Sequence, residues 1–239
     1  MATKPFLRAT IAVLSFPFIV LSRVAELLDS WKVRDDINEC LTVVDACANN
    51  VPTRFVDVLI AAEDHRNMVH AGVDPLAMIR AAIVRLKLNQ TEGASTMEQQ
   101  LVRTIMRRYE HSLSRKLKEQ SLAIAVCRKR PKAQLAAAYL SIAYYGSGRS
   151  GIAALKELCG NDLQLADARQ IIGAIARLKY PQPVNPSLLW RHKIDRRILY
   201  IARRMRRRAD QASMSTTWIG ELNRPLDYHP TTVDVRRGI

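Results

Sequence analysis

Two acidic residues in different settings are the part of this sequence best suited to chemistry. Glu63 closes an apolar i, i+3, i+4, i+7 pattern that begins at Phe55, so a helix should present its carboxylate at one end. Glu119 follows Arg115 by four residues and Lys116 by three, which places both cations beside it on one helix face. A base for an incoming hydroxyl and cations for a departing anion are what transfer away from a phosphate-bearing donor requires.

Each acid also has a simpler interpretation by residue type. Glu63 and Asp64 beside His65 could form a solvated helix end. The stretch Arg115–Glu119 could be a ladder of surface ion pairs, which adds little stability. Residue type alone favours these simpler interpretations, so the order and spacing of the surrounding motifs must decide.

A polar turn, Gly93–Gln100, lies between the two acids. Ser95 and Thr96 each begin a capping-box pattern for the helix that follows. Capping explains one hydroxyl and one polar partner, but it leaves Gln100 and Arg103 sharing a face at i, i+3. Free N–H groups at a helix start also bind anions, so this turn is a candidate wall of the same site.

The elements that must position these residues are predicted to be helices. Ala, Leu, Arg, Lys and Gln dominate, β-branched runs are short, and 48% of the 239 residues are apolar, which favours one all-α domain over residues 40–208. Asp74-Pro75 is a strong helix start, with Gly72 in the turn before it. Other helices are expected at about Met97–Arg108, Arg115–Cys127, Lys132–Tyr145, Leu163–Leu178 and Ser187–Arg208, and a polar tail is expected over 209–239.

The formal charge of +15 indicates an anionic partner, although much of it would simply cover solvated helix faces. Nucleic acid, an acidic membrane surface and a phosphorylated substrate all fit this charge. The four cysteines show no CxxC pattern and no histidine at metal-ligand spacing, so a zinc site is not expected. A disulfide between Cys40 and Cys47 is also not expected, because two helical turns separate their Cα atoms by about 10 Å.

The amino terminus, residues 1–39, contains the apolar run Ala9–Ser22 behind Lys4 and Arg8. The run is shorter than the ~20 residues that span a bilayer comfortably, and it contains Pro17. A signal-anchor helix, an interfacial helix and a buried core helix all remain open. Positive charge before the run would keep the amino terminus cytoplasmic and send the rest outward.

The motifs taken together resemble the peptidoglycan glycosyltransferases of family 51, the lipid II polymerases found alone or fused to penicillin-binding transpeptidases. The resemblance covers about residues 56–205, and a fifth block, around Arg196–Ile201, is only loosely similar. The four blocks that carry it are Glu63-Asp64…His70-x-Gly72-x-Asp74, Gly93-x-Ser95-Thr96-x-x-Gln99-Gln100-Leu101, Arg115-Lys116-x-x-Glu119, and Lys132…Tyr139-Leu140 followed by Tyr144-Tyr145-Gly146.

The resemblance implies a lysozyme-like helical fold with an amino-terminal anchor. It makes Glu63 the base that deprotonates the acceptor 4-hydroxyl, and it places Glu119 at the pyrophosphate of the donor, where it would hold cationic groups or a divalent ion such as Mg²⁺ or Mn²⁺. Apart from this optional ion, the resemblance implies no cofactor. The residues that it implies for substrate binding are Asp64, Ser95, Thr96, Gln99, Gln100, Arg103, Arg115, Lys116 and Lys118.

The implied partners are lipid II and the undecaprenyl-pyrophosphate-linked glycan at a bacterial membrane, together with transpeptidases or envelope-assembly proteins, and not nucleic acid. The implied location is the cytoplasmic (inner) membrane, crossed once, with the catalytic domain on the periplasmic face. No Ser-x-x-Lys occurs and about 30 residues follow the last predicted helix, so the chain is expected to be monofunctional.

Several positions depart from the family pattern. Asn67 replaces a usual phenylalanine, Arg103 replaces a lysine, and His111 replaces an arginine near the phosphates. The other departures are at Thr104 and Ser141, usually asparagines, and at Ala136, usually a leucine. These changes leave open a catalytically impaired scaffold of envelope assembly. A lysozyme-like glycan-cleaving enzyme is a further alternative, although the cations around Glu119 favour its ionised form rather than the protonated acid which that chemistry needs.

Overall fold

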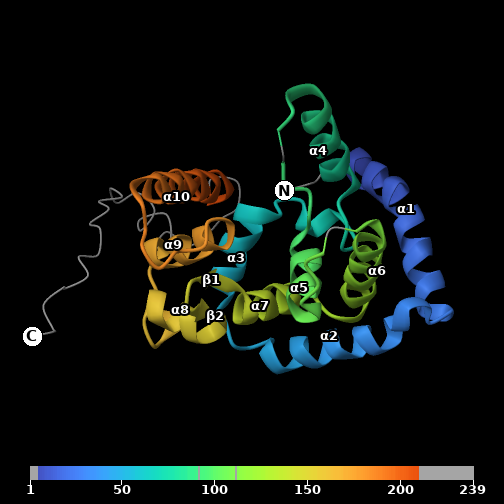
Figure 1. The fold of residues 1–239 in the computed structure, drawn as a ribbon, viewed down its shortest axis with the longest axis horizontal. Coiled ribbons are helices and arrows are strands. Elements are labelled where there is room, and N and C mark those ends of the chain that lie inside the picture. Colours follow the sequence, from blue (N-terminus) through green and yellow to red (C-terminus); the bar gives the residue numbers. More distant parts are fainter. Residues whose placement is uncertain (1–4, 91, 111, 210–239) are drawn as a thin grey trace, which may run out of the picture.

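The computed structural model describes residues 5–90, 92–110 and 112–209, and this part of the chain is predominantly helical (Figure 1). The predicted all-α fold is therefore confirmed. The long helices are α1 (Pro5–Leu27), α2 (Val33–Cys47), α3 (Thr53–Glu63), α4 (Pro75–Leu88), α5 (Met97–Met106), α6 (Leu113–Lys129), α7 (Lys132–Ile142), α8 (Gly151–Cys159), α9 (Ala168–Lys179) and α10 (Leu188–Ala209). Short 3-10 turns occur at Ser30–Lys32, Asn67–Val69 and Leu163–Leu165, and two short strands are β1 (Tyr144–Gly146) and β2 (Arg149–Ser150).

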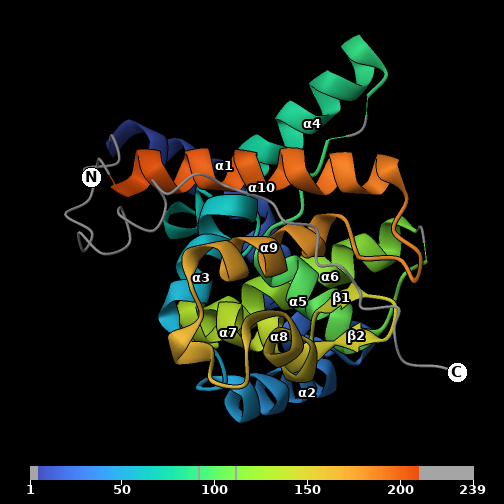
Figure 2. The same ribbon diagram turned by 90° about the vertical axis from the view of Figure 1, so that its left-hand side faces the viewer.

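Helix α7 is at the centre of the fold. Its residues from Leu135 to Ser141 are all buried, and it packs against α2, α3, α5 and α8 (Figures 1 and 2). The run Ala136–Ala138 explains this position, because small side chains let several helices approach one axis closely. Helix α6 is buried from Lys118 to Val126 and packs against α1, α2 and α5. The two motif-bearing helices α5 and α6 are therefore held against each other by the core.

Two predicted helix starts are confirmed atom by atom. The Asp74 carboxylate accepts from the Ala77 N–H at 3.0 Å, with Pro75 in the first turn of α4. At α5 the capping box is the one that begins at Thr96, whose hydroxyl accepts from the Gln99 N–H while the Gln99 amide oxygen accepts from the Thr96 N–H. The polar turn between the two acids is therefore rigidly attached to its helix.

Three predicted helix boundaries were wrong. Helix α5 ends at Met106 because Arg107 adopts a left-handed conformation, with φ of 51°. The predicted helix from Lys132 stops at Ile142, and Tyr144 and Tyr145 lie in β1, which pairs antiparallel with β2. The predicted helix from Leu163 begins instead at Ala168, and α8 before it was not expected.

Helix α1 is longer than the apolar run that predicted it and continues through Pro17. By length and composition it could cross a membrane, while Ile11 and Ala25 are buried in the structure. It lies along α6, where the Ser22 hydroxyl donates to the Ser121 carbonyl at 2.8 Å (Figure 1). All four cysteines are free, including Cys40 and Cys47. His111 and the predicted tail from residue 210 lie outside the described residues.

Candidate active site

Glu63, at the carboxyl end of α3, lies in the wall of a cavity of about 570 Å³. Ser95, Gln100 and Arg103 from the predicted site line the same cavity, together with Tyr139 from α7. Five basic residues also line it, against the two carboxylates of Glu63 and Glu92: Arg80, Arg103, Lys179, Arg197 and Arg204. An excess of positive charge in a concave site attracts and concentrates anionic ligands.

Arg197 on α10 is the partner of Glu63. Its Nη2 donates to Glu63 Oε1 and, at 3.0 Å, to the Ala62 carbonyl, so the guanidinium fixes the carboxylate against the end of α3. Glu63 lines the cavity, and among the described residues its Oε2 accepts no hydrogen bond or ion pair. Sequence reasoning missed Arg197, because 134 positions separate it from Glu63. The only available signal was the weak similarity around Arg196–Ile201.

Glu119 is surrounded by three cations. Its Oε2 accepts from Arg115 at 2.6 Å and from Arg103 Nε at 2.9 Å, and its Oε1 accepts from Lys116 at 2.5 Å and from Arg103 Nη2 at 3.1 Å. Arg115 and Lys116 were predicted neighbours on the same helix, whereas Arg103 arrives from α5. Helices α5 and α6, which carry residues of two predicted blocks, therefore meet through the Glu119 carboxylate.

The ionisation of this cluster follows from its contacts. Burial by itself would raise the pKa of Glu119, but the hydrogen bonds from Arg103 and Lys116 outweigh it, so the pKa lies below its usual value. Burial lowers the pKa of Lys116, partly offset by Glu119. Glu119 is consequently an ionised anchor for cations and not a proton donor at neutral pH, which argues against the glycan-cleaving alternative.

Ser95 connects the cluster to the cavity. Its hydroxyl oxygen lies 3.1 Å from Lys116 Nζ and 3.3 Å from Arg103 Nη2, both of which donate to it. Arg103 lines the cavity that contains Glu63 while it bonds to Glu119. Arg103 is therefore held in place by Glu119 and Ser95, and its side chain remains 31% exposed, enough to meet a ligand.

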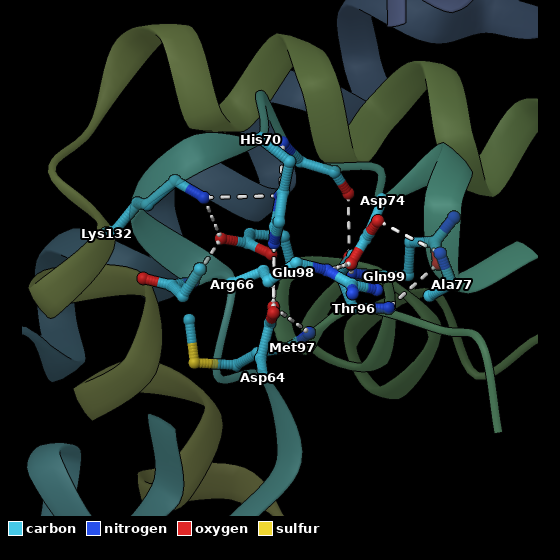
Figure 3. A network of polar contacts seen from close by, with 12 residues as sticks. Asp64, Arg66, His70, Asp74, Ala77, Thr96, Met97, Glu98, Gln99 and Lys132 are labelled. Atoms are coloured by element: carbon cyan, nitrogen blue, oxygen red, sulfur yellow. Dashed lines mark hydrogen bonds and ion pairs between the residues drawn. The ribbon is translucent and has the colours of Figure 1, made fainter. Parts of the chain in front are cut away.

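A second polar network surrounds Asp64, the residue after Glu63, in the protein interior (Figure 3). Asp64 faces inward, where both of its oxygens lie 3.0 Å from His70 Nε2 and Oδ2 lies 3.4 Å from the Met97 N–H. Burial opposes ionisation of Asp64, but the His70 hydrogen bond outweighs it and lowers the pKa of the carboxyl. Glu98 accepts at 3.0 Å from both Lys132 and Asn67. The network ties α3, the loop after it, α5 and α7 together.

The hydrogen bonds of His70 decide whether this network fits a metal ion. Ligand atoms of Asp64, His70 and Glu98 lie within 4.8 Å of one another. However, Nδ1 of His70 receives the Gly72 N–H at 3.2 Å and lies 3.4 Å from the Lys132 ammonium, so the ring proton is on Nε2 and points at Asp64. An Nε2 that carries a proton has no lone pair for a cation. The residues therefore do not fit a metal at this place.

The donor set around Glu119 does not fit a divalent ion either. Both carboxylate oxygens accept hydrogen bonds from the cationic groups of Arg103, Arg115 and Lys116. These three cations would repel a further positive ion. A divalent ion at Glu119 stays a prediction, which removal of metal by a chelator tests.

Most of the remaining predicted site residues lie outside the cavity wall, and Gln100 is the exception. Asp64, Thr96 and Gln99 are buried and bond within the fold. Lys118 is ion-paired with Asp36 on α2 and does not line the Glu63 cavity. Gln100 lines the cavity, and its amide oxygen accepts from the Tyr139 hydroxyl at 2.7 Å, which orients the amide. The geometry thus separates residues that can touch a ligand from residues that support them.

The Glu63 carboxylate shares one cavity of an all-helical domain with Arg103, which a buried cationic cluster holds in place. This arrangement suits group transfer from an anionic substrate. A protein-family model described as Transglycosylase matches residues 38–206 of this chain. The chain belongs to the transglycosylase family, glycosyltransferase family 51.

Curated relatives support the same assignment. Penicillin-binding protein 1A of Rickettsia prowazekii (strain Madrid E) is 33% identical over 165 residues, covering 66% of this chain and 20% of the relative. Penicillin-binding protein 1A of Aquifex aeolicus (strain VF5) is 32% identical over 160 residues, 65% and 22% respectively. Penicillin-binding protein 1B of Vibrio cholerae serotype O1 is 31% identical over 186 residues, 75% and 24%. The chain thus spans about a fifth to a quarter of these relatives.

Proposed function

We propose that this protein is a peptidoglycan glycosyltransferase that polymerises lipid II into glycan strands. The observation that carries the proposal is the shared cavity: Glu63 lies in its wall with Arg103, which is bonded to Glu119 and Ser95. Family membership supports the glycosyl transfer, and the excess of positive charge in the cavity supports a donor that leaves as pyrophosphate.

In the proposed reaction, Glu63 takes the proton of the acceptor 4-hydroxyl. The acceptor oxygen forms a bond to the anomeric carbon of the donor, the bond from that carbon to the pyrophosphate oxygen breaks, and the electron pair leaves with the pyrophosphate. Attack from the opposite face converts an α-linked donor into a β-linked product, so one base suffices. The leaving group needs charge stabilisation rather than a proton, and Arg103 supplies it.

Arg197 would act through Glu63, and Glu119 would act through Arg103. Arg197 holds Glu63 by Oε1, so the bond leaves Oε2 for the incoming hydroxyl. Glu119 neutralises part of the charge of Arg103, Arg115 and Lys116, which allows three cations to stay close together before a pyrophosphate arrives. Membrane attachment by α1, with the catalytic domain on the periplasmic face, is part of the same proposal and rests on the length and apolar composition of α1.

The experiment that tests the proposal is polymerisation of labelled lipid II by the purified full chain in detergent, with the products separated by length. Glycan strands from the native protein that are absent with Glu63→Gln support the polymerase and its base. Lipid II that binds without reacting would instead favour the scaffold alternative. Release of fragments from mature wall, without polymer, would favour a glycan-cleaving enzyme.

A further inference from the structure

The outer face of α10 carries a row of basic side chains that the Glu63 cavity does not use. From Leu188 to Ala209 the helix contains nine Lys and Arg residues but one acidic residue, Asp195. The exposed members recur at helical spacing opposite the buried Ile201 and Met205. The basic stripe consists of His192, Lys193, Arg196, Arg203 and Arg207.

Apolar side chains are interspersed with the basic stripe. Leu199 is 43% exposed within the stripe, and Leu188 and Leu189 at the start of the helix are 85% and 64% exposed. Tyr200, which borders the Glu63 cavity at the edge of the stripe, is 42% exposed. Cations mixed with leucine and tyrosine are typical of a helix that lies at a membrane interface.

The position of α10 in the fold gives this face a direction. The helix packs on α3 and α9 through its opposite side, and both of these lie beneath it in Figures 1 and 2. The basic stripe therefore points to the side of the molecule on which α4 protrudes (Figure 2). Helix α4 exposes its own apolar residues there, including Ile83, Leu86 and Leu88. A planar membrane surface in contact with the tip of α4 would therefore face the basic stripe of α10.

We propose that the basic stripe of α10 is a docking surface for the headgroups of acidic phospholipids. The charge of the stripe complements a phosphate-rich plane, and its leucines and tyrosine suit the boundary between headgroups and acyl chains. The opposite face of the same helix carries Arg197, which holds Glu63. Docking of α10 consequently sets the orientation of the Glu63 cavity toward the lipid surface. The proposal concerns bulk lipid rather than the substrate, so it does not depend on the proposed function.

Acylation of Lys193 tests the proposal without an activity assay. The full chain is reconstituted into neutral phosphatidylcholine vesicles or into vesicles with about one third phosphatidylglycerol, and an uncharged amine-acylating reagent is added. Mass spectrometry then compares Lys193 with Lys156, which is exposed on α8, on the other side of the fold (Figure 2). We expect acylation of Lys193 to slow about fivefold in the acidic vesicles and to recover at high salt, with Lys156 unchanged.

Two matched variants identify the groups responsible. Arg196→Gln/Arg203→Gln/Arg207→Gln removes three exposed charges of the stripe, and we expect Lys193 to be acylated almost as fast in acidic as in neutral vesicles. Lys32→Gln/Arg130→Gln/Lys156→Gln removes the same charge elsewhere and should leave the protection of Lys193 intact. Circular dichroism confirms that both variants remain helical.

Three results would overturn the proposal. One is equal acylation of Lys193 in both kinds of vesicle, and another is equal loss of protection in the two triple variants. The third is protection of Lys193 by a short nucleic-acid duplex as strong as that by acidic vesicles, which would identify a general polyanion surface. In each of these cases polymerisation of lipid II could still proceed, so failure of this proposal is distinguishable from failure of the proposed function.

Discussion

Glu63 and Glu119 are both glutamates beside arginine, yet the structure surrounds them differently. Glu63 has one cationic partner, Arg197, and lies in the wall of the large cavity. Glu119 has three cationic partners, and its side chain is 3% exposed. The first carboxylate can meet a ligand, while the second is occupied by the protein itself.

The difference shows how similar local sequence patterns produce different chemistry. A carboxylate whose oxygens are all engaged by cations stays ionised and holds those cations together. A carboxylate with one partner and one oxygen on a cavity can accept a proton from a bound hydroxyl. Five predictions test whether the two acids really divide the work in this way, from the largest expected effect to the smallest.

Glu63→Gln should have the largest effect on activity. The amide keeps the size of the side chain but removes the base, so we expect polymerisation of lipid II to fall by about 10³-fold or more. Initial rates on labelled lipid II measure this, and the thermal midpoint serves as the control for folding. A variant that keeps more than a tenth of the native rate would end the assignment of Glu63 as base.

Glu119→Gln should reduce activity by about 10²-fold, because Arg103 and Lys116 lose the charge that positions them. Unlike Glu63→Gln, it should also destabilise the fold, by about 1–2 kcal/mol, since charged donors lose their ionised acceptor. Paired urea titrations and rate measurements separate the two effects. Equal stability of Glu63→Gln and Glu119→Gln would contradict the contrast drawn between the two sites.

Replacement of Arg197 should have a smaller effect that reveals its role as a positioning residue. Arg197→Gln leaves the Glu63 carboxylate without the donor that fixes it, so we expect kcat to fall about tenfold with little change in KM. Arg197→Lys should restore part of kcat. An equal loss of kcat in both variants, together with a lower thermal midpoint, would mean that Arg197 supports the fold alone.

The smallest effects concern pH and metal. The folded pKa values of Glu119 and Asp64 lie below their usual values, so their contribution to stability is complete above pH ~5 and is lost as the pH falls through ~4 and below. Unfolding free energies measured from pH ~6 to ~3 should therefore decline, and less steeply in Glu119→Gln.

EDTA should leave the polymerisation rate within about twofold, because three cations already surround Glu119. A strong loss on chelation would instead support the predicted ion.

Local signals in the sequence predicted local structure well. Asp74 and Thr96 cap α4 and α5 as expected, and the spacing of Arg115, Lys116 and Glu119 predicted two of the three ion pairs. These features succeed because all participants lie within one helical turn or two. The capping box of Asp167 and Gln170 was equally local and would have marked the true start of α9.

Contacts between distant segments could not be predicted in the same way. Arg197 reaches Glu63 across 134 positions, and Lys132 reaches Glu98 across 34, and neither pair leaves a periodic signal. The strand at Tyr144 was mistaken for helix because its partners are β2 and the backbone of Gln182, which a local pattern does not include. Lys118 shares a helix with Glu119, yet it turns toward Asp36 on α2.

The buried pair of Asn67 and Glu98 has a consequence for how this sequence can change over time. The Asn67 amide donates to Glu98, and Lys132 donates to the same oxygen, although Glu98 Oε2 and Asn67 Oδ1 find no partner among the described residues. Phenylalanine at position 67 alone would set an aromatic ring against a buried charge that has lost a donor. The two positions are therefore coupled, and an apolar residue at position 67 should be tolerated better when position 98 changes with it.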